Sequence, residues 1–266
     1  MKQTLYIDCS AGVCGDMILG ALIDLGADIG FLETELRRLD MPSYRLRPER
    51  KERDGDAGVD LHVLYEGGAD WTGEHPHTHG HLHHHGGHRS YRSIREMIEK
   101  GGLGGKAGDI ALDIFAVIAE AEAAVHGVRP ETVVFHELGR TDSIIDIAGT
   151  AICVDRLGAG GGLEILCSTL HDGKGFIDCD HGRIPVPVPA VRELLKGSGL
   201  KLISEDVNTE LVTPSGLGIL KGLGARCVEE MPQMDCFRTG YGFGKRQTGR
   251  FNALRMVLGL RHSANS

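Results

Sequence analysis

Near its start the chain reads Leu5-Tyr6-Ile7-Asp8-Cys9-Ser10-Ala11-Gly12-Val13-Cys14-Gly15-Asp16-Met17. The apolar run that ends at Asp8 predicts a strand, and the glycine-containing segment 10–16 predicts a tight turn. From Met17 onward, apolar residues recur at helical spacing until Gly26, which ends the helix. A strand, a tight loop and a helix in this order place a ligand at the helix N-terminus. The spacing is not that of a Walker motif and includes no lysine, so nucleotide binding here has little support.

Helices and strands alternate along the rest of the chain. Apolar residues recur with a period of about 3.6 between Leu103 and Val125, which predicts a long amphipathic helix. Proline occupies every second position of 185–189, so we expect that segment to be extended and outside a central strand. This mixture predicts an α/β or α+β fold, with a mixed sheet, packed helices and a long disordered histidine-rich loop. We expect the other helices at 29–39, 141–157 and 214–223, and strands within 44–65 (two, around a turn at 54–56) and at 133–135, 164–167, 235–242 and 253–259.

A dense run of histidines lies inside the chain, where eight of its fourteen histidines fall within residues 75–88. Neutral imidazole is a good ligand for nickel, zinc and copper. The run is internal and interrupted by Gly, Pro and Thr, unlike a purification tag. The alternative is a solvated polar loop without a site. We expect divalent-metal binding by His75, His77, His79, His81, His83, His84, His85 and His88.

The histidine run divides the chain into three parts. We expect residues 1–65 to form an N-terminal strand–loop–helix and hairpin region, and residues 66–90 to form the metal-binding loop. Residues 91–266 are then the remainder of an α/β domain of catalytic type. With 266 residues, of which 41% are hydrophobic, the chain can bury a sizeable core.

Composition excludes several classes of protein. A formal net charge of -8 argues against a nucleic-acid binder, which needs clustered lysine and arginine. No stretch approaches the 18 or so consecutive apolar residues of a membrane span, and the N-terminus does not resemble a signal peptide. Seven cysteines, odd in number and without CxxC spacing, point to reduced thiols. We therefore expect a cytoplasmic protein without a membrane or nucleic-acid partner.

The segment 136–146 is the strongest candidate for chemistry. It carries His136, Glu137, Asp142 and Asp146, and the two aspartates share a helical face because they are four residues apart. Two carboxylates on one face repel each other unless a cation lies between them. The alternative is capping, because Ser143-x-x-Asp146 fits a capping box and Asp142 favours the helix dipole.

A second polar cluster, Asp178-Cys179-Asp180-His181-Gly182-Arg183, offers a thiol, an imidazole and carboxylates. Asp and Gly are also the commonest turn residues, so a surface turn is the alternative. The motifs G-x-S-x-G and HExxH are absent from the chain, which gives serine hydrolysis no support.

Several segments, in order along the whole chain, together resemble one family. The chain looks like the nickel-insertion protein (LarC) family of nickel-pincer cofactor biosynthesis. The segments that carry the resemblance are 8–17, the histidine run up to Arg89, 119–127, 135–139, 142–146, 181–187, 210–216 and 240–244.

The resemblance implies insertion of nickel(II) into pyridinium-3,5-bisthiocarboxylic acid mononucleotide, the precursor of the lactate racemase cofactor, by a CTP-dependent cyclometallase of the lyase class. Family members continue well past Gly259 into a C-terminal domain tied to CTP, with Mg or Mn. That domain is not in this sequence, so the resemblance implies a C-terminal LarC domain or split-gene product as partner. The family pattern departs at Ser10-Ala11 and Arg140-Thr141.

On this reading the histidine run collects nickel, and a folded site carries out the insertion. We expect His136, Glu137, Asp142 and Asp146 to be catalytic, with His136 or Glu137 as the base that removes a ring proton. We expect Asp8, Gly12, Gly15, Asp16 and His181 to bind the cofactor precursor. The competing hypothesis is a nickel store or metallochaperone without catalysis, and a zinc or magnesium hydrolase is a third. A homo-oligomer stays open.

Overall fold

The structure is a computed structural model that describes residues 1–65, 89–159, 162–179, 182–246 and 249–262. All eight histidines expected to bind metal, and His181, lie outside the described residues.

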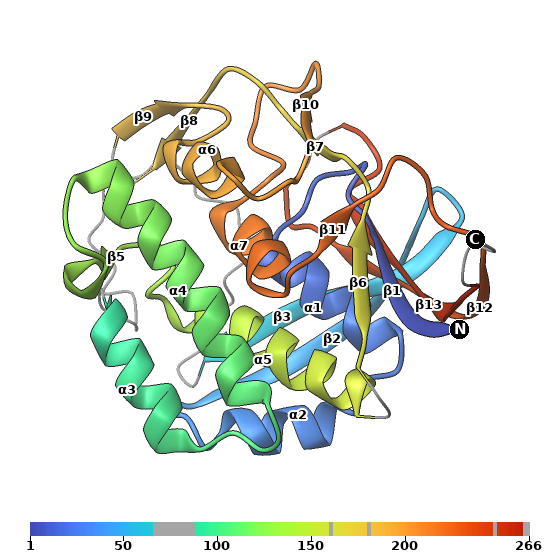
Figure 1. The fold of residues 1–266 in the computed structure, drawn as a ribbon, viewed down its shortest axis with the longest axis horizontal. Coiled ribbons are helices and arrows are strands. Elements are labelled where there is room, and N and C mark those ends of the chain that lie inside the picture. The colour runs from blue at the N-terminus through green and yellow to red at the C-terminus, as the bar shows by residue number, and fades with distance from the viewer. Residues whose placement is uncertain (66–88, 160–161, 180–181, 247–248, 263–266) are drawn as a thin grey trace.

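A seven-stranded mixed sheet, in the order β11-β6-β1-β13-β12-β3-β2, forms one layer of the molecule (Figure 1). Strands β1, β6 and β11 run parallel, β13 is antiparallel to both β1 and β12, and β12 is parallel to β3. Five strands therefore point the same way, and their carboxyl ends lie along one edge of the sheet. The bounds are β1 (Lys2–Asp8), β2 (Tyr44–Arg53), β3 (Asp56–Tyr65), β6 (Glu164–Cys167), β11 (Arg226–Cys227), β12 (Met234–Phe243) and β13 (Ala253–Arg261).

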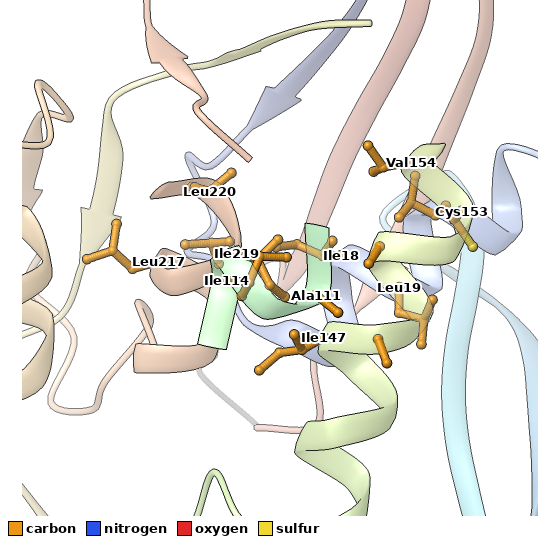
Figure 2. Packing of buried hydrophobic residues seen from close by; sticks show 14 of the residues in the cluster. Ile18, Leu19, Ala111, Ile114, Ile147, Cys153, Val154, Leu217, Ile219 and Leu220 are labelled. Atoms are coloured by element: carbon orange, nitrogen blue, oxygen red, sulfur yellow. The ribbon is translucent and has the colours of Figure 1, made fainter. Parts of the chain in front are cut away.

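Helices stack in layers on one face of this sheet. Helix α1 packs on β12, β3 and β13, α5 packs on α1, and α4 lies beyond α5 and against α6 and α7 (Figure 1). Their apolar side chains interlock between the helices, with Ile18, Ile114, Ile147 and Ile219 fully buried (Figure 2). The helices of the described part are α1 (Gly15–Asp24), α2 (Ile29–Leu36), α3 (Tyr91–Gly101), α4 (Ala107–His126), α5 (Thr141–Gly158), α6 (Pro189–Leu195) and α7 (Pro214–Gly222). None of them is long and apolar enough to cross a membrane.

Glycines set the distance between α1 and the sheet. A Cβ on Gly240 would lie 2.8 Å from the Leu25 nitrogen, and one on Gly242 would lie 2.6 Å from the Ala21 nitrogen. Because neither position has a side chain, the α1 backbone lies directly on β12.

Short elements complete the fold. They are a hairpin of β8 (Phe176–Cys179) and β9 (Gly182–Pro185), a pair of β4 (Arg89–Ser90) with β5 (Val134–Phe135), a pair of β7 (Leu170–Asp172) with β10 (Leu202–Ser204), and the 3-10 helix η1 (Pro130–Thr132).

The structure confirms the predicted mixture of a mixed sheet and packed helices, including the opening strand–loop–helix unit. The helix expected from Leu103 begins at Ala107, because Gly102 and Gly105 adopt positive φ before it. The helix expected to reach residue 39 ends at Leu36. The capping-box interpretation of Ser143 and Asp146 is wrong, because the N-cap of α5 is Arg140 and not Ser143.

Candidate functional site

The candidate site lies at the edge of the sheet where the parallel strands end. Strand β1 leads there into the loop 9–14 and α1, β3 ends at Tyr65, and β12 leads to Lys245 and Arg246. Ligands of open α/β sheets bind at this edge, because loops and helix N-termini converge on it.

The loop 9–14 is held in place by backbone hydrogen bonds. Gly12 donates to the Cys9 carbonyl (3.0 Å), Val13 donates to the Leu211 carbonyl (2.8 Å), and Thr213 donates to the Val13 carbonyl (3.0 Å). Gly12 has φ +93°, and a Cβ there would overlap the Leu211 backbone. The loop therefore requires glycine at this position, and it is clamped to the segment that precedes α7.

Three aspartates meet beside this loop, and we call Asp16, Asp142 and Asp146 the acid cluster. Asp16 lies in the first turn of α1 and Asp142 in the first turn of α5. Burial raises the pKa of Asp146 well above its usual value, and the charges of Asp16 and Asp142 raise it further. Burial also raises the pKa of Asp142, with Asp16 adding to the effect. These shifts show that the three carboxyls are electrostatic neighbours.

Two helix N-termini point their partial positive charge at the acid cluster. The N-cap residues of α1 and α5, Cys14 and Arg140, make no side-chain capping bond. Instead the Asp16 and Asp142 carboxyls accept first-turn N–H groups, from Met17 (2.9 Å) and Ser143 (2.9 Å), where the helix dipoles favour negative charge. The Cys14 thiol, at the N-cap of α1, donates a hydrogen bond to Asp16 Oδ1 (2.7 Å). The partial positive charge of the helix termini thus offsets part of the repulsion between the three carboxylates.

Tyr65 and Lys245 border the acid cluster. Burial raises the pKa of Tyr65, and the charges of Asp142 and Asp146 raise it further. Lys245 pairs with Asp60 and donates to the Leu61 carbonyl (2.6 Å), and its charge lowers the pKa of Asp146 in part. The site therefore has a phenol and an ammonium group as well as carboxyls.

Among the described residues, no three or more His, Cys, Asp or Glu side chains form a group that could hold a metal ion. Within the acid cluster, the other two carboxyls are close enough to raise the pKa of Asp146, but the three do not form a preformed metal site.

A second set of charged groups lies around residues 210–212, the segment to which the loop 9–14 is hydrogen-bonded. Glu210, which is 6% exposed, pairs with Arg246 (Nη2 to Oε2, 2.9 Å). Burial raises the pKa of Glu210 to about 7, and the charges of Asp172 and Glu137 contribute to the rise. Glu137 itself is exposed. This set brings together residues from β7, from the approach to α7, from the end of β12 and from the segment before α5.

The predicted site residues fall into separate surroundings. Asp8 forms an ion pair with Arg255 (2.8 Å), and its charge acts on Tyr6 and Cys9. The His136 ring lies 6.3 Å from the His126 ring, between centroids. Glu137 borders Glu210. Gly15 lies against Asp146, since a Cβ there would come within 2.8 Å of Asp146 Oδ2.

Sequence reasoning missed Tyr65, Lys245, Asp172, Glu210 and Arg246 as members of these sets. Each lies at or just beyond the carboxyl end of a strand or in a loop clamped to one. Strand direction was the signal that could have indicated Tyr65 and Lys245, but parallel pairing of β3 with β12 is not readable from the residues alone.

Both ends of the histidine-bearing segment are fixed near the acid cluster. Tyr65 precedes the segment, and Arg89 follows it. Arg89 donates to the Gly139 carbonyl (2.9 Å) and lies close enough to Tyr65 to affect its pKa. The covalent path through residues 66–88 therefore starts and finishes at the candidate site.

Comparison with known proteins gives a consistent family. A family model described as nickel insertion protein matches residues 5–266. A pyridinium-3,5-bisthiocarboxylic acid mononucleotide nickel insertion protein of Acetivibrio thermocellus is 48% identical over 97% of this chain and 60% of its own length. A protein of the same name from Lactiplantibacillus plantarum is 43% identical over 96% of this chain and 61% of its length. A putative nickel insertion protein of Rhodopirellula baltica is 39% identical over 100% of this chain and 62% of its length.

The chain thus spans about three-fifths of the length of the curated relatives that it matches. No solved structure matches it.

Proposed function

The chain belongs to the nickel insertion protein family, and on that premise we propose that it carries the insertion site of a nickel chelatase acting on pyridinium-3,5-bisthiocarboxylic acid mononucleotide. The names of its relatives support the substrate. The observation that carries the location of the site is the meeting of Asp16, Asp142 and Asp146 at the N-termini of α1 and α5, on the sheet edge where such folds bind ligands.

Electrostatics supports a cation as cargo of this site. Three neighbouring carboxyls must either keep protons or gain a positive partner, and burial strengthens the conflict. A nickel(II) ion arriving with the substrate supplies that charge, after which the carboxyls can ionise. We propose that the acid cluster orients the ion while the substrate provides its sulfur and carbon ligands.

Forming a nickel–carbon bond releases a ring proton, so the site needs a base. We propose His136 or Glu137 for this role. His136 is half-buried and Glu137 is exposed, and both lie in the segment that leads into α5. We propose that the precursor is bound by Asp8, Gly12, Gly15, Asp16 and His181. At Gly12 and Gly15, which have no side chain, the main chain would contact the precursor. We propose that nickel(II) is collected by the eight histidines of the run, His75, His77, His79, His81, His83, His84, His85 and His88.

The remaining length of the relatives has no counterpart in this sequence. We propose that CTP, with Mg or Mn, acts through such a C-terminal portion, and that the two portions together form a cyclometallase of the lyase class. A cytoplasmic location is part of this proposal.

The test is insertion in vitro. The chain is incubated with nickel, CTP and the dithiocarboxylate substrate, with and without the C-terminal portion of a relative, and nickel-bearing product is measured by absorbance and mass. We expect product only when both portions are present. Product from the C-terminal portion alone would show that the acid cluster is not the insertion site.

A nickel store or metallochaperone is the second candidate, favoured by the histidine run alone. A store has no use for buried carboxyls of raised pKa. If the chain retained nickel but formed no product with the C-terminal portion of a relative, and Asp142→Asn with Asp146→Asn left that retention unchanged, the storage function would replace the enzymatic one.

A further inference from the structure

Glu210 and Asp172 form a buried carboxyl pair that the acid cluster does not include. Arg246 grips Glu210 twice, through Nη2 to Oε2 (2.9 Å) and through Nη1 to the main-chain carbonyl (2.8 Å). The same Nη1 also donates to the Thr209 hydroxyl (3.4 Å), so the guanidinium is held against residues 209–210. The charged groups that face Glu210 are Arg246, Asp172 and Glu137.

Asp172 is fully buried, and its two carboxyl oxygens differ in their hydrogen bonding. Oδ1 accepts three backbone N–H groups, from Gly173 (2.8 Å), Leu211 (2.8 Å) and Val212 (3.0 Å). Oδ2 is buried, yet it has no hydrogen-bond partner in the described part of the chain. Burying a charged carboxylate oxygen without a hydrogen-bond partner costs free energy of folding. If that oxygen is protonated, it becomes a hydrogen-bond donor.

The charge balance indicates a proton at this pair. Two buried carboxyls share a single guanidinium, and the exposed Glu137 adds negative charge. Burial raises the pKa of Asp172 despite its three N–H donors, and raises that of Glu210 to about 7. Two interacting carboxyls in such surroundings titrate as a unit that keeps one proton into the neutral range.

We propose that Asp172 and Glu210 are the proton acceptor of the insertion reaction and receive, through Glu137, the proton that leaves the pyridinium ring. This assignment rests on the proposed function. The ring C–H bond breaks, its electron pair forms the bond to nickel(II), and the proton passes to Glu137 and then to the ionised member of the pair. No oxidation or reduction occurs. Glu137 is the catalytic residue in this sequence, and Glu210 and Asp172 act through it.

A metal site is a weaker interpretation of the same residues, because the described residues contain no metal-holding group of three or more such ligands. A purely structural role accounts for Oδ1 of Asp172 and for Arg246, but it leaves Oδ2 unexplained. The orphan oxygen therefore favours a group that gains and loses a proton.

The first test measures protonation without activity. Side-chain carboxyl carbons are labelled with ¹³C and titrated by NMR in the full chain. We expect Glu210 to titrate near neutral pH, and Asp172→Asn to lower its midpoint by about one pKa unit, because a negative neighbour is removed. Asn keeps the Oδ1 acceptor, so the fold is retained. Glu205→Gln is the matched control, since Glu205 lies on the same segment but pairs with Arg250 and His171 outside the pair. A Glu210 midpoint at an ordinary carboxyl value, unchanged by Asp172→Asn, would overturn the proposal.

The second test follows the ring proton. The substrate is held in D₂O with the chain and the C-terminal portion of a relative, without nickel, and deuterium uptake at the ring carbon is measured by mass. We expect Glu210→Gln to slow uptake by about 10²-fold and to shift its pH profile, as loss of a proton acceptor requires, and Glu205→Gln to leave both unchanged. Equal uptake by wild type and Glu210→Gln, or none by wild type, would overturn the role of the pair. Failure of nickel insertion alongside normal uptake would instead contradict the proposed function and leave the pair intact.

Discussion

Asp146 of α5 lies directly against the backbone of Gly15 in α1. A Cβ built on Gly15 would come within 2.8 Å of both Cβ and Oδ2 of Asp146. The absence of a side chain at residue 15 is therefore what lets a carboxyl from one helix reach the N-terminus of another. The acid cluster depends on this contact.

Replacing Gly15 by alanine should separate α1 from Asp146. We expect Gly15→Ala to lower the free energy of unfolding by about 1–3 kcal/mol, since the new methyl meets the Asp146 Cβ as well as its mobile carboxyl end. The rate of nickel insertion by this variant should fall as well. Urea denaturation measures the first effect and product formation the second.

Gly108→Ala is the control, because Gly108 is also in a first helical turn but nothing lies within 4 Å of its Cβ position. That variant should gain up to about 1 kcal/mol from helix propensity. Equal behaviour of the two variants would show that the Gly15 contact is unimportant.

Removing the Asp146 carboxyl should stabilise the chain while harming the site. A carboxyl whose pKa is raised on folding binds more protons in the folded than in the unfolded state, so its contribution is favourable below the ordinary carboxyl pKa and is lost as pH rises through the raised value. We expect Asp146→Asn to raise the free energy of unfolding at neutral pH and to flatten its decline with pH. Denaturation at several pH values from about 4 to 8 measures this.

Asp206 provides a contrast of opposite sign. It is exposed and paired with Lys174 (2.7 Å), which lowers its pKa. Asp206→Asn should therefore leave stability at neutral pH unchanged or slightly reduced. Greater stability from Asp206→Asn than from Asp146→Asn would contradict the burial argument.

Close packing of α7 on α4 should depend on Gly218. A Cβ at Gly218 would overlap the Cγ1 and Cδ1 atoms of Ile118. We expect Gly218→Ala to destabilise by about 1–3 kcal/mol. With Ile118→Ala already present, the same change should cost far less, because the colliding atoms are gone.

A double-mutant cycle on free energies of unfolding measures this coupling. Additive effects of Gly218→Ala and Ile118→Ala would mean that the two helices are not in contact there. The result matters for the site, because Thr213, the N-cap of α7, lies three residues after Glu210.

The histidine run and His136 should fail in different ways. We expect His136→Ala to abolish cofactor maturation at any nickel concentration. Replacing half of the histidines between 75 and 88 by asparagine should matter mainly when nickel is scarce. Product formed across a nickel titration measures both, and an equal loss from both variants would reject the division between collecting and inserting the metal.

The sequence predicted most of the elements from periodicity and turn residues. The opening strand–loop–helix, the two strands around Asp54–Asp56 and the helix after Thr213 follow from local patterns and occur in the structure. Helix α3 was missed although Tyr91, Ile94 and Ile98 recur at helical spacing. Strands β7 to β11 are two to four residues long, too short for alternation to be visible.

The candidate site was only partly predictable, for a physical reason. Asp142 and Asp146 share a helix face, which spacing reveals. Their meeting with Asp16, 126 residues earlier in the chain, depends on α1 packing on α5, and no local pattern contains it. Asp8 looked equivalent to Asp16 in sequence, yet it pairs with Arg255 on a neighbouring strand.

The anchoring of Tyr65 and Arg89 at the acid cluster has a quantitative consequence for anything that residues 66–88 capture. No residue of that segment is more than about 12 positions from an anchor, so even a fully extended path keeps it within roughly 40 Å of the carboxyls. One ion confined to such a volume corresponds to a local concentration on the order of millimolar. Delivery of nickel from residues 66–88 to the acid cluster therefore becomes independent of the nickel concentration in solution, as long as that segment holds an ion.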